Sequence, residues 1–215
     1  MLKDYYDYPD LLNNNRSWVN DCLKQDPDYF SKLAEGQRPP FLYIGCSDSR
    51  KPLNMMTQTR PGEVFIHRNI ANQVSLTDMN LLSVLEFAIE TLNVKHVIVC
   101  GHYHCGGVEA AYRHTATGLV DNWVTPIKDL AMVHQDELNR LATEEERLNR
   151  LSELNVIAQL RNLCKISTVQ RAFKNGKYPQ LHGWIFAMKS GLIQEQKLPI
   201  REWKEMGLLP KDFPE

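Results

Sequence analysis

The chain has 215 residues, with 25 Lys and Arg against 26 Asp and Glu and a formal net charge of −1. This length suits one α/β domain with a sizeable core, and no Pro/Gly/Ser-rich linker divides it. The near balance of charge points away from nucleic acid and from an anionic membrane surface. No apolar run reaches the roughly 18 residues of a membrane span, and residues 1–10 lack a secretory signal pattern. We therefore expect a cytoplasmic protein that acts on small molecules.

Two helices are expected before the first strand. Apolar residues recur at approximately helical spacing from Leu11 to Ala34, and Asp26-Pro27 interrupts them. Nothing in this segment indicates chemistry, but the apolar faces of such helices must be buried against something. The stretch Glu35–Pro40 contains a glycine and two prolines, which end the second helix and lead into a strand.

Two short apolar runs each end next to side chains that bind metals. Phe41–Gly45 is predicted to be a buried strand followed by Cys46, and Val97–Cys100 another that is followed by His102 and Cys105. Parallel strands that end side by side would place these residues at one edge of a sheet, where open α/β folds build their sites. Two thiolates and an imidazole with one position left open form the catalytic type of zinc site. The pattern predicts one Zn²⁺ per subunit.

The other cysteines and His104 are not expected to bind the metal. The total of five cysteines is odd, which argues against a disulfide framework, and Cys22, Cys100 and Cys164 are expected to be small buried hydrophobes. Cys100 should point into the sheet packing, because a ligand should come from the turn beyond the strand. His104 cannot readily share a face with residues two before and one after it at the start of a helix.

The rest of the chain predicts further strands and helices. A strand is expected over Glu63–His67, and Thr77-Asp78 is expected to open a helix that continues to about Leu92. The later elements are expected to be helices from Val108 to about Thr115, Trp123 to about His134 and Glu144 to about Phe173, a strand over Tyr178–Met188 and a hairpin partner over Leu192–Gln196. The sequence thus predicts an α/β fold with a mainly parallel sheet of about four strands, a short antiparallel edge strand and flanking helices.

Asp48 and Arg50 follow Cys46 closely enough for both to lie near the metal. A carboxylate beside a guanidinium favours a bidentate pair in which the carboxylate is ionised. In one interpretation the pair is structural and caps a helix that begins near Pro52. In the other, Asp48 accepts a hydrogen bond from zinc-bound hydroxide, and Arg50 keeps Asp48 from becoming the fourth ligand.

The motifs Cys46–Arg50 and His102–Gly107 resemble those of the β-class carbonic anhydrases, in the bacterial-type branch. The segment Pro61–Asn72 is similar to the one that joins the two motifs in that family, and the likeness extends from about Leu11 to about Leu192. The resemblance implies a carbonate dehydratase, a lyase that hydrates carbon dioxide reversibly to bicarbonate and a proton. Zinc-bound hydroxide oriented by the Asp-Arg pair would be the nucleophile.

The resemblance also implies roles for residues that spacing alone leaves open. Gln37, otherwise a solvated loop amide, would donate a hydrogen bond to bicarbonate. Phe65 and Ile70 would form an apolar wall over the metal, which suits a neutral linear substrate. The ring of Phe87 would face a pocket shared with a partner subunit, although a plain core or interface role stays open. Gly106 would help to stabilise the bicarbonate that forms.

The family's N-terminal helices embrace a second subunit, so the resemblance implies a homodimer or a dimer of dimers. We expect one domain with an N-terminal helical arm over 1–36, a zinc-binding core over 37–197 and a C-terminal tail over 198–215. Two other functions stay open: a hydrolase of carbonyl sulfide or carbon disulfide on the same scaffold, and a non-catalytic zinc-binding protein. What the tail packs on is left open.

A subset of the family holds a non-catalytic bicarbonate beside the active site with a Trp, an Arg and a Tyr. This chain resembles that subset in Arg68, but Tyr43 stands where the Trp would be and Phe186 where the Tyr would be. Since one hydroxyl donor is lost, weak or absent inhibition by bicarbonate at that position is expected.

Overall fold

The computed structural model describes residues 7–176 and 179–214. It contains two compact units, one that ends at Gln37 and one that begins at Arg38. Of the helices in these described ranges, none is long and apolar enough to cross a membrane. That the arm and the core belong to one domain stays a prediction.

The first unit consists of two helices, α1 (Tyr8–Gln25) and α2 (Tyr29–Ala34), as predicted. Trp18 of α1 packs edge to face on Phe30, with ring centroids 5.4 Å apart, and so joins the two helices. No residue of α1 or α2 is buried, and apolar side chains such as Leu11 lie exposed. Within this unit the apolar face of α1 is therefore left without a cover.

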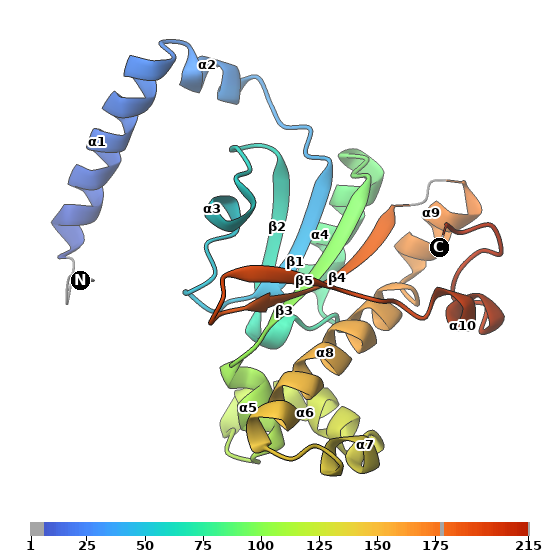
Figure 1. Ribbon diagram of the computed structural model, residues 1–215. Helices are drawn as coiled ribbons and strands as arrows, with labels where there is room; N and C mark the ends of the chain where they lie inside the picture. The colour runs from blue at the N-terminus through green and yellow to red at the C-terminus, as the bar shows by residue number, and fades with distance from the viewer. Residues whose placement is uncertain (1–6, 177–178, 215) are drawn as a thin grey trace. The chain divides into compact units, whose positions relative to one another are not determined.

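The second unit is built on a five-stranded sheet (Figure 1). Its elements are, in chain order, β1 (Phe41–Cys46), α3 (Leu53–Thr57), β2 (Val64–Asn69), the 3₁₀ turn η1 (Ile70–Asn72), α4 (Met79–Glu86), the π-helical turn η2 (Phe87–Thr91), β3 (His96–His102), α5 (Gly106–Tyr112), α6 (Gly118–Val133), α7 (Gln135–Asn139), α8 (Glu144–Leu163), α9 (Ser167–Lys174), β4 (Gln180–Ala187), β5 (Leu192–Gln196) and α10 (Ile200–Glu205). The strand order is β2-β1-β3-β4-β5; the first four strands are parallel and β5 is antiparallel to β4. The predicted α/β class and sheet are confirmed. Tyr178, the predicted start of the fourth strand, lies outside the described residues.

The two faces of the sheet are buried in different ways. On one face, Leu42 and Ile44 of β1 belong to the main core, which also holds buried residues of α4, α8 and α9. On the other face, Tyr43 packs in a smaller cluster with Leu53 of α3 and Cys100 of β3. Burial on both sides explains why β1 and β3 are continuous apolar runs. In Figure 1, α5, α6 and α7 gather beyond the end of the sheet at which β3 leads into α5.

The helix predicted from Glu144 to Phe173 is instead two helices, α8 and α9. The start is as expected, because Thr143 and Glu146 form a reciprocal capping box. The break falls between Leu163 and Ser167, where Ile166 has an extended backbone and a side chain that is buried in the main core. Helical periodicity alone does not reveal this turn, since the residues on both sides of it are buried.

Two further differences concern the end of β3 and the tail. The strand continues to His102 instead of ending at Cys100, because its pairing with β4 extends to the register of His102 with Phe186. The tail contains α10, and Trp203 of that helix and Leu209 after it are buried in the main core. The tail thus packs on the same face of the sheet as α4 and α8.

Candidate functional site

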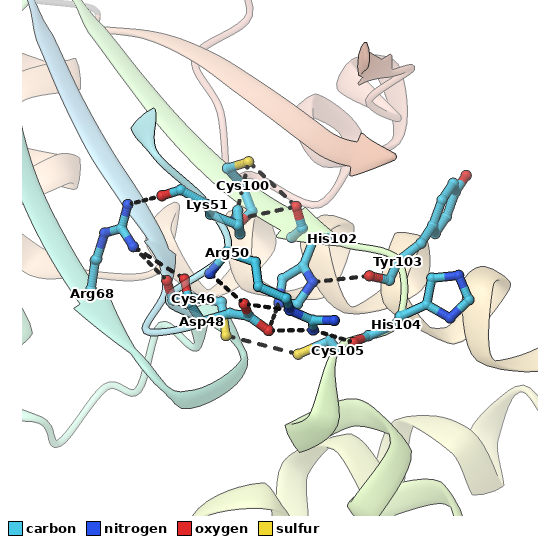
Figure 2. Close-up of polar contacts among 11 residues, drawn as sticks. Cys46, Asp48, Arg50, Lys51, Arg68, Cys100, His102, Tyr103, His104 and Cys105 are labelled. Atoms are coloured by element: carbon cyan, nitrogen blue, oxygen red, sulfur yellow. Dashed lines mark hydrogen bonds and ion pairs between the residues drawn. The ribbon is translucent and has the colours of Figure 1, made fainter. Parts of the chain in front are cut away.

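Three side chains with metal-binding atoms meet at the carboxyl ends of β1 and β3. Cys46 is the last residue of β1, His102 is the last residue of β3, and Cys105 immediately precedes α5. One ligand atom from each lies within 4.8 Å of the others, and all three residues are buried. Figure 2 shows the two sulfurs approaching each other below the His102 ring. The pairing of β1 with β3 therefore brings together the three residues that the sequence singled out.

The spacing of these atoms fits a tetrahedral metal ion. The Cys46 and Cys105 sulfurs are 3.9 Å apart. A disulfide needs about 2.05 Å, whereas two thiolates on one tetrahedral Zn²⁺ lie about 3.8 Å apart when each Zn–S bond is about 2.3 Å. His102 donates from Nδ1 to the Tyr103 carbonyl oxygen at 3.0 Å, which leaves Nε2 as the ring's acceptor. Nε2 is buried and has no hydrogen-bond partner among the described residues, as a metal-ligating nitrogen would.

The acidities of the two thiols differ. The neighbouring Cys105 thiol lowers the pKa of Cys46 most, and His102 and the backbone N–H groups of Asp48 and Ala71 lower it further. The same contact and burial raise the pKa of Cys105. The Cys46 thiol therefore ionises readily, while the Cys105 thiol would lose its proton to solvent when a metal ion binds. Metal binding here is expected to release protons.

Asp48 and Arg50 form a bidentate pair beside the ligands. Arg50 donates from Nε to Asp48 Oδ1 at 3.0 Å and from Nη2 to Oδ2 at 2.6 Å. The same Nη2 donates to the carbonyl oxygen of His104 at 3.2 Å, so the guanidinium also holds the loop before Cys105. Asp48 Oδ2 lies 3.8 Å from His102 Nε2. Hydrogen bonding to Arg50 lowers the pKa of Asp48 to about 2, which keeps the carboxylate ionised.

The pair lies beside the candidate metal ligands rather than at the cap of α3. Helix α3 begins after Pro52, and no side chain caps its first turn. Instead, the Asp48 carboxylate also accepts the backbone N–H of Arg50 at 2.9 Å, and this fixes the turn that carries it. The carboxylate thus faces His102 with its remaining lone pairs.

Ile70 packs closely against the second motif at Gly107. A Cβ atom on Gly107 would lie 2.8 Å from Ile70 Cγ2, so only glycine allows α5 to approach this closely. Trp123 of α6 donates from Nε1 to the Ile70 carbonyl oxygen at 2.8 Å and holds the turn in place. Gly106 is the first residue of α5, where backbone N–H groups have no partner within the helix.

The other predicted pocket residues are Phe65, Phe87 and Gln37. The rings of Phe65 in β2 and Phe87 in η2 pack on each other with centroids 5.8 Å apart. Phe87 is 45% exposed, so its ring is available to a further surface. Gln37 is the last residue of the first unit. The substrate-binding roles of Gln37, Phe65, Ile70, Phe87 and Gly106 stay predictions.

The other cysteines and His104 were predicted not to bind the metal. Among the described residues, they are not part of the group of candidate ligands. Cys100 points into the sheet packing, as expected, and Cys164 is buried in the main core. Cys22 is only half-buried, so its expected burial is wrong: no residue of α1 or α2 is buried within their unit. His104 has a positive φ of 57°, and its Nε2 lies 3.6 Å from a carboxylate oxygen of Glu145.

Arg68 and Lys51 make contacts near the site that the sequence did not predict. Arg68 donates to the backbone carbonyl oxygens of Lys51, Asp48 and Cys46 at 2.6, 3.4 and 3.5 Å. Lys51 is 1% exposed and reaches back toward Cys100. Single charged residues carry no periodic signal, and the usual expectation for them is a solvated surface. Figure 2 shows Arg68 and Cys105 on opposite sides of Asp48, and Lys51 reaching toward Cys100.

The fold and the site together define an α/β protein with a buried Cys-His-Cys metal-binding centre at the carboxyl ends of a parallel sheet. The carbonic anhydrase family model matches residues 41–193. A carbonic anhydrase of Emericella nidulans is 45% identical over 185 residues, which cover 86% of this chain and 81% of the relative. The chain belongs to the β-class carbonic anhydrase family and is an enzyme of the lyase class, as the sequence predicted.

Solved structures agree with this assignment. The β-carbonic anhydrase CafA of Aspergillus fumigatus has a TM-score of 0.86 at 37% identity, and the match covers 95% of this chain and 99% of that one. One of two tetrameric β-carbonic anhydrases of Sordaria macrospora has a TM-score of 0.84 at 40% identity and covers 87% of this chain and 95% of its own.

Proposed function

We propose that the protein catalyses the zinc-dependent, reversible hydration of carbon dioxide to bicarbonate and a proton. The observation that carries this proposal is the buried Nε2 of His102, which has no hydrogen-bond partner in the described part of the chain, on a ring with a ligand atom within 4.8 Å of two cysteine sulfurs. Cys46, His102 and Cys105 would hold one Zn²⁺ per subunit. Bound zinc would lower the pKa of a water molecule enough to supply a nucleophile near neutral pH.

The neighbouring residues orient the reaction. The Asp48 carboxylate, fixed by Arg50, accepts a hydrogen bond from the attacking oxygen and thereby turns a lone pair of that oxygen toward the substrate. Ile70, with Phe65 and Phe87, supplies an apolar wall for carbon dioxide. Gly106 at the start of α5, together with Gln37, donates to the bicarbonate oxygens. The net reaction adds water to carbon dioxide and releases one proton to buffer.

We also propose that the protein is a cytoplasmic homo-oligomer. The Sordaria macrospora relatives are tetrameric. The exposed apolar face of α1 would be covered by a second subunit, which supports a homodimer or a dimer of dimers. The arm, core and tail would then act as one domain per subunit.

Stopped-flow hydration of carbon dioxide by the zinc-loaded protein tests this function. We expect measurable turnover with carbon dioxide and slow turnover with carbonyl sulfide, because a carbonic anhydrase pocket is selective for the smaller substrate. Faster turnover with carbonyl sulfide than with carbon dioxide would assign a different hydrolase. Stoichiometric zinc without turnover on either substrate would assign a non-catalytic zinc protein.

We also expect that millimolar bicarbonate does not inhibit through a second site near Arg68. The guanidinium already donates to three backbone carbonyl oxygens, and Phe186 offers no hydroxyl. A hydrogen bond from a hydroxyl group to a bound anion contributes about 1.5–3 kcal/mol. The absence of a hydroxyl at Phe186 therefore weakens anion binding by roughly tenfold or more. Initial rates at increasing bicarbonate measure this. Steep inhibition that Arg68→Ala relieves would contradict the expectation.

A further inference from the structure

Lys51 is a buried cation with no acidic partner. Its side chain is among the largest fully buried ones, with 1% relative exposure. Nζ donates to the Cys100 carbonyl oxygen at 3.1 Å and lies 3.5 Å from both the Gly101 carbonyl oxygen and the Cys100 sulfur. Across the described part of the chain, no Asp or Glu forms an ion pair with it. Burying an ammonium is costly unless charge nearby compensates it, so its position calls for a physical reason.

The surroundings of Nζ lead directly to the metal ligands. Cys100 and Gly101 are the two residues that precede His102 in β3. The Tyr43 ring of β1 lies with its centroid 5.6 Å from Nζ. On the opposite face, a Cβ on Gly101 would come within 2.7 Å of Val156 Cγ2, so the end of β3 is held between Lys51 and α8.

Lys51 also joins the end of β3 to the loop that follows β1. Arg68 of β2 donates to the Lys51 carbonyl oxygen at 2.6 Å and to the Cys46 and Asp48 carbonyl oxygens on the same loop. The loop that follows Cys46 is thus fastened to β3 by the Lys51 side chain and to β2 by the Asp48 and Lys51 carbonyl groups. Lys51 therefore links the loop that follows β1 to the end of β3, and each of these two strands supplies a ligand.

The charges around the proposed zinc site leave room for further positive charge. Two thiolates balance the charge of Zn²⁺, and Arg50 balances Asp48. Two cations can offset the negative charge that forms on the attacking oxygen: Arg68, which donates to the Cys46 and Asp48 carbonyl oxygens, and Lys51 at the end of β3. Of the groups packed about Nζ, namely the Tyr43 ring, the Cys100 thiol and the Cys100 and Gly101 carbonyl groups of β3, none carries a carboxylate.

We propose that Lys51 is an electrostatic positioning residue, whose buried positive charge holds the two ligand-bearing strand ends together and offsets the negative charge of the catalytic site. The inference rests on the proposed function. An opposite charge close to an ionising group shifts the pKa of that group by about one unit or more. Removal of the Lys51 charge should therefore raise the pH at which activity is half-maximal and weaken zinc binding.

Two variants of the full-length protein test the inference. Lys51→Met keeps the length of the side chain but removes charge and donor, and Lys51→Gln keeps a donor without the charge. For both we expect the pH midpoint of carbon dioxide hydration to rise by about one unit. Zinc affinity, measured by competition with a chelator and so independently of activity, should fall about tenfold.

Leu53→Ala is the matched control, because Leu53 packs in the same cluster as Tyr43 and Cys100 but carries no charge. It should lower the melting temperature while both the pH midpoint and the zinc affinity stay unchanged. If the Lys51 variants shift the two quantities no more than Leu53→Ala does, or if Lys51→Gln matches the unmodified protein, the charge role is overturned. An unmodified protein that binds no zinc would overturn the proposed function and this inference together.

Discussion

Cys105→Ser is expected to abolish zinc binding and hydration activity together. Serine is a poor zinc ligand at neutral pH because its hydroxyl stays protonated, so the site would keep one thiolate and one imidazole. Changes to residues that only support a ligand cost 10–100-fold in metal affinity, so the loss of a ligand itself should exceed about 100-fold. Elemental analysis after gel filtration measures the zinc, and stopped-flow hydration measures the activity.

The same substitution should lower stability, because a metal that binds only the folded state stabilises that state. At a free zinc concentration about 1,000-fold above the dissociation constant this linkage is worth about 4 kcal/mol. The melting temperature of the variant should therefore respond little to added zinc. Cys164→Ser is the control: this thiol is also fully buried, but it lies in the main core, so the variant should lose stability and keep its zinc. Full zinc content in Cys105→Ser would instead point to Cys100 or His104 as a ligand.

Arg50→Ala is expected to keep its zinc and lose most of its activity. Without the guanidinium, the Asp48 carboxylate loses both of its side-chain hydrogen bonds and stands beside an open position on a cation. Direct ligation of zinc by Asp48 then becomes its best alternative, and it excludes the water from which the nucleophile forms. Cobalt-substituted protein reports the change, since replacement of water by carboxylate alters the visible spectrum.

Asp48→Asn should behave differently from Arg50→Ala. The amide is a weak ligand, so water stays on the metal and only the orientation of the attacking oxygen is lost. Misplaced catalytic groups cost on the order of 10²-fold in rate, which is the residual defect we expect. Arg171→Ala is the control for the loss of an arginine from an ion pair, because Arg171 pairs with Glu86 and Glu90 on the surface and should leave activity unchanged. Full activity of Arg50→Ala with an unaltered cobalt spectrum would return the pair to a structural role.

The pH dependence of stability follows from the direction in which the pKa of Asp48 is shifted. Arg50 lowers the pKa of Asp48 to about 2, below the ordinary value of about 3.9. Its contribution to stability is therefore complete above about pH 4 and is lost as the pH falls through 2. Between pH 6 and 9 the carboxylate does not titrate, so the expected rise of activity above neutral pH reflects the ionisation of the attacking water, which Asp48 would displace from the metal when hydroxide is scarce. A flat activity profile over that range would contradict this account.

Much of the site could be predicted because its chemistry is local in the chain. Cys46 and His102 each follow a short apolar run, and the three-residue step from His102 to Cys105 places both on one side of a turn. Parallel pairing of the two strands then follows from the alternation of strands with helices. The roles of Gln37, Phe65 and Phe87 depended instead on the resemblance, because an amide and two aromatic rings are compatible with many positions in a fold.

What the sequence determined by itself was the set of strands, most helices and the ligand residues, because apolar periodicity, caps and residue chemistry act over a few neighbouring positions. The tertiary structure decided the break before α9, the packing of Trp203 and the burial of Lys51. Each of these depends on groups far apart in the chain, such as the contact of Lys51 with Cys100 across 49 positions. Whether a residue is buried depends on which distant parts of the chain pack together. A charged residue, or one in an irregular segment, has no local sequence pattern that predicts its burial.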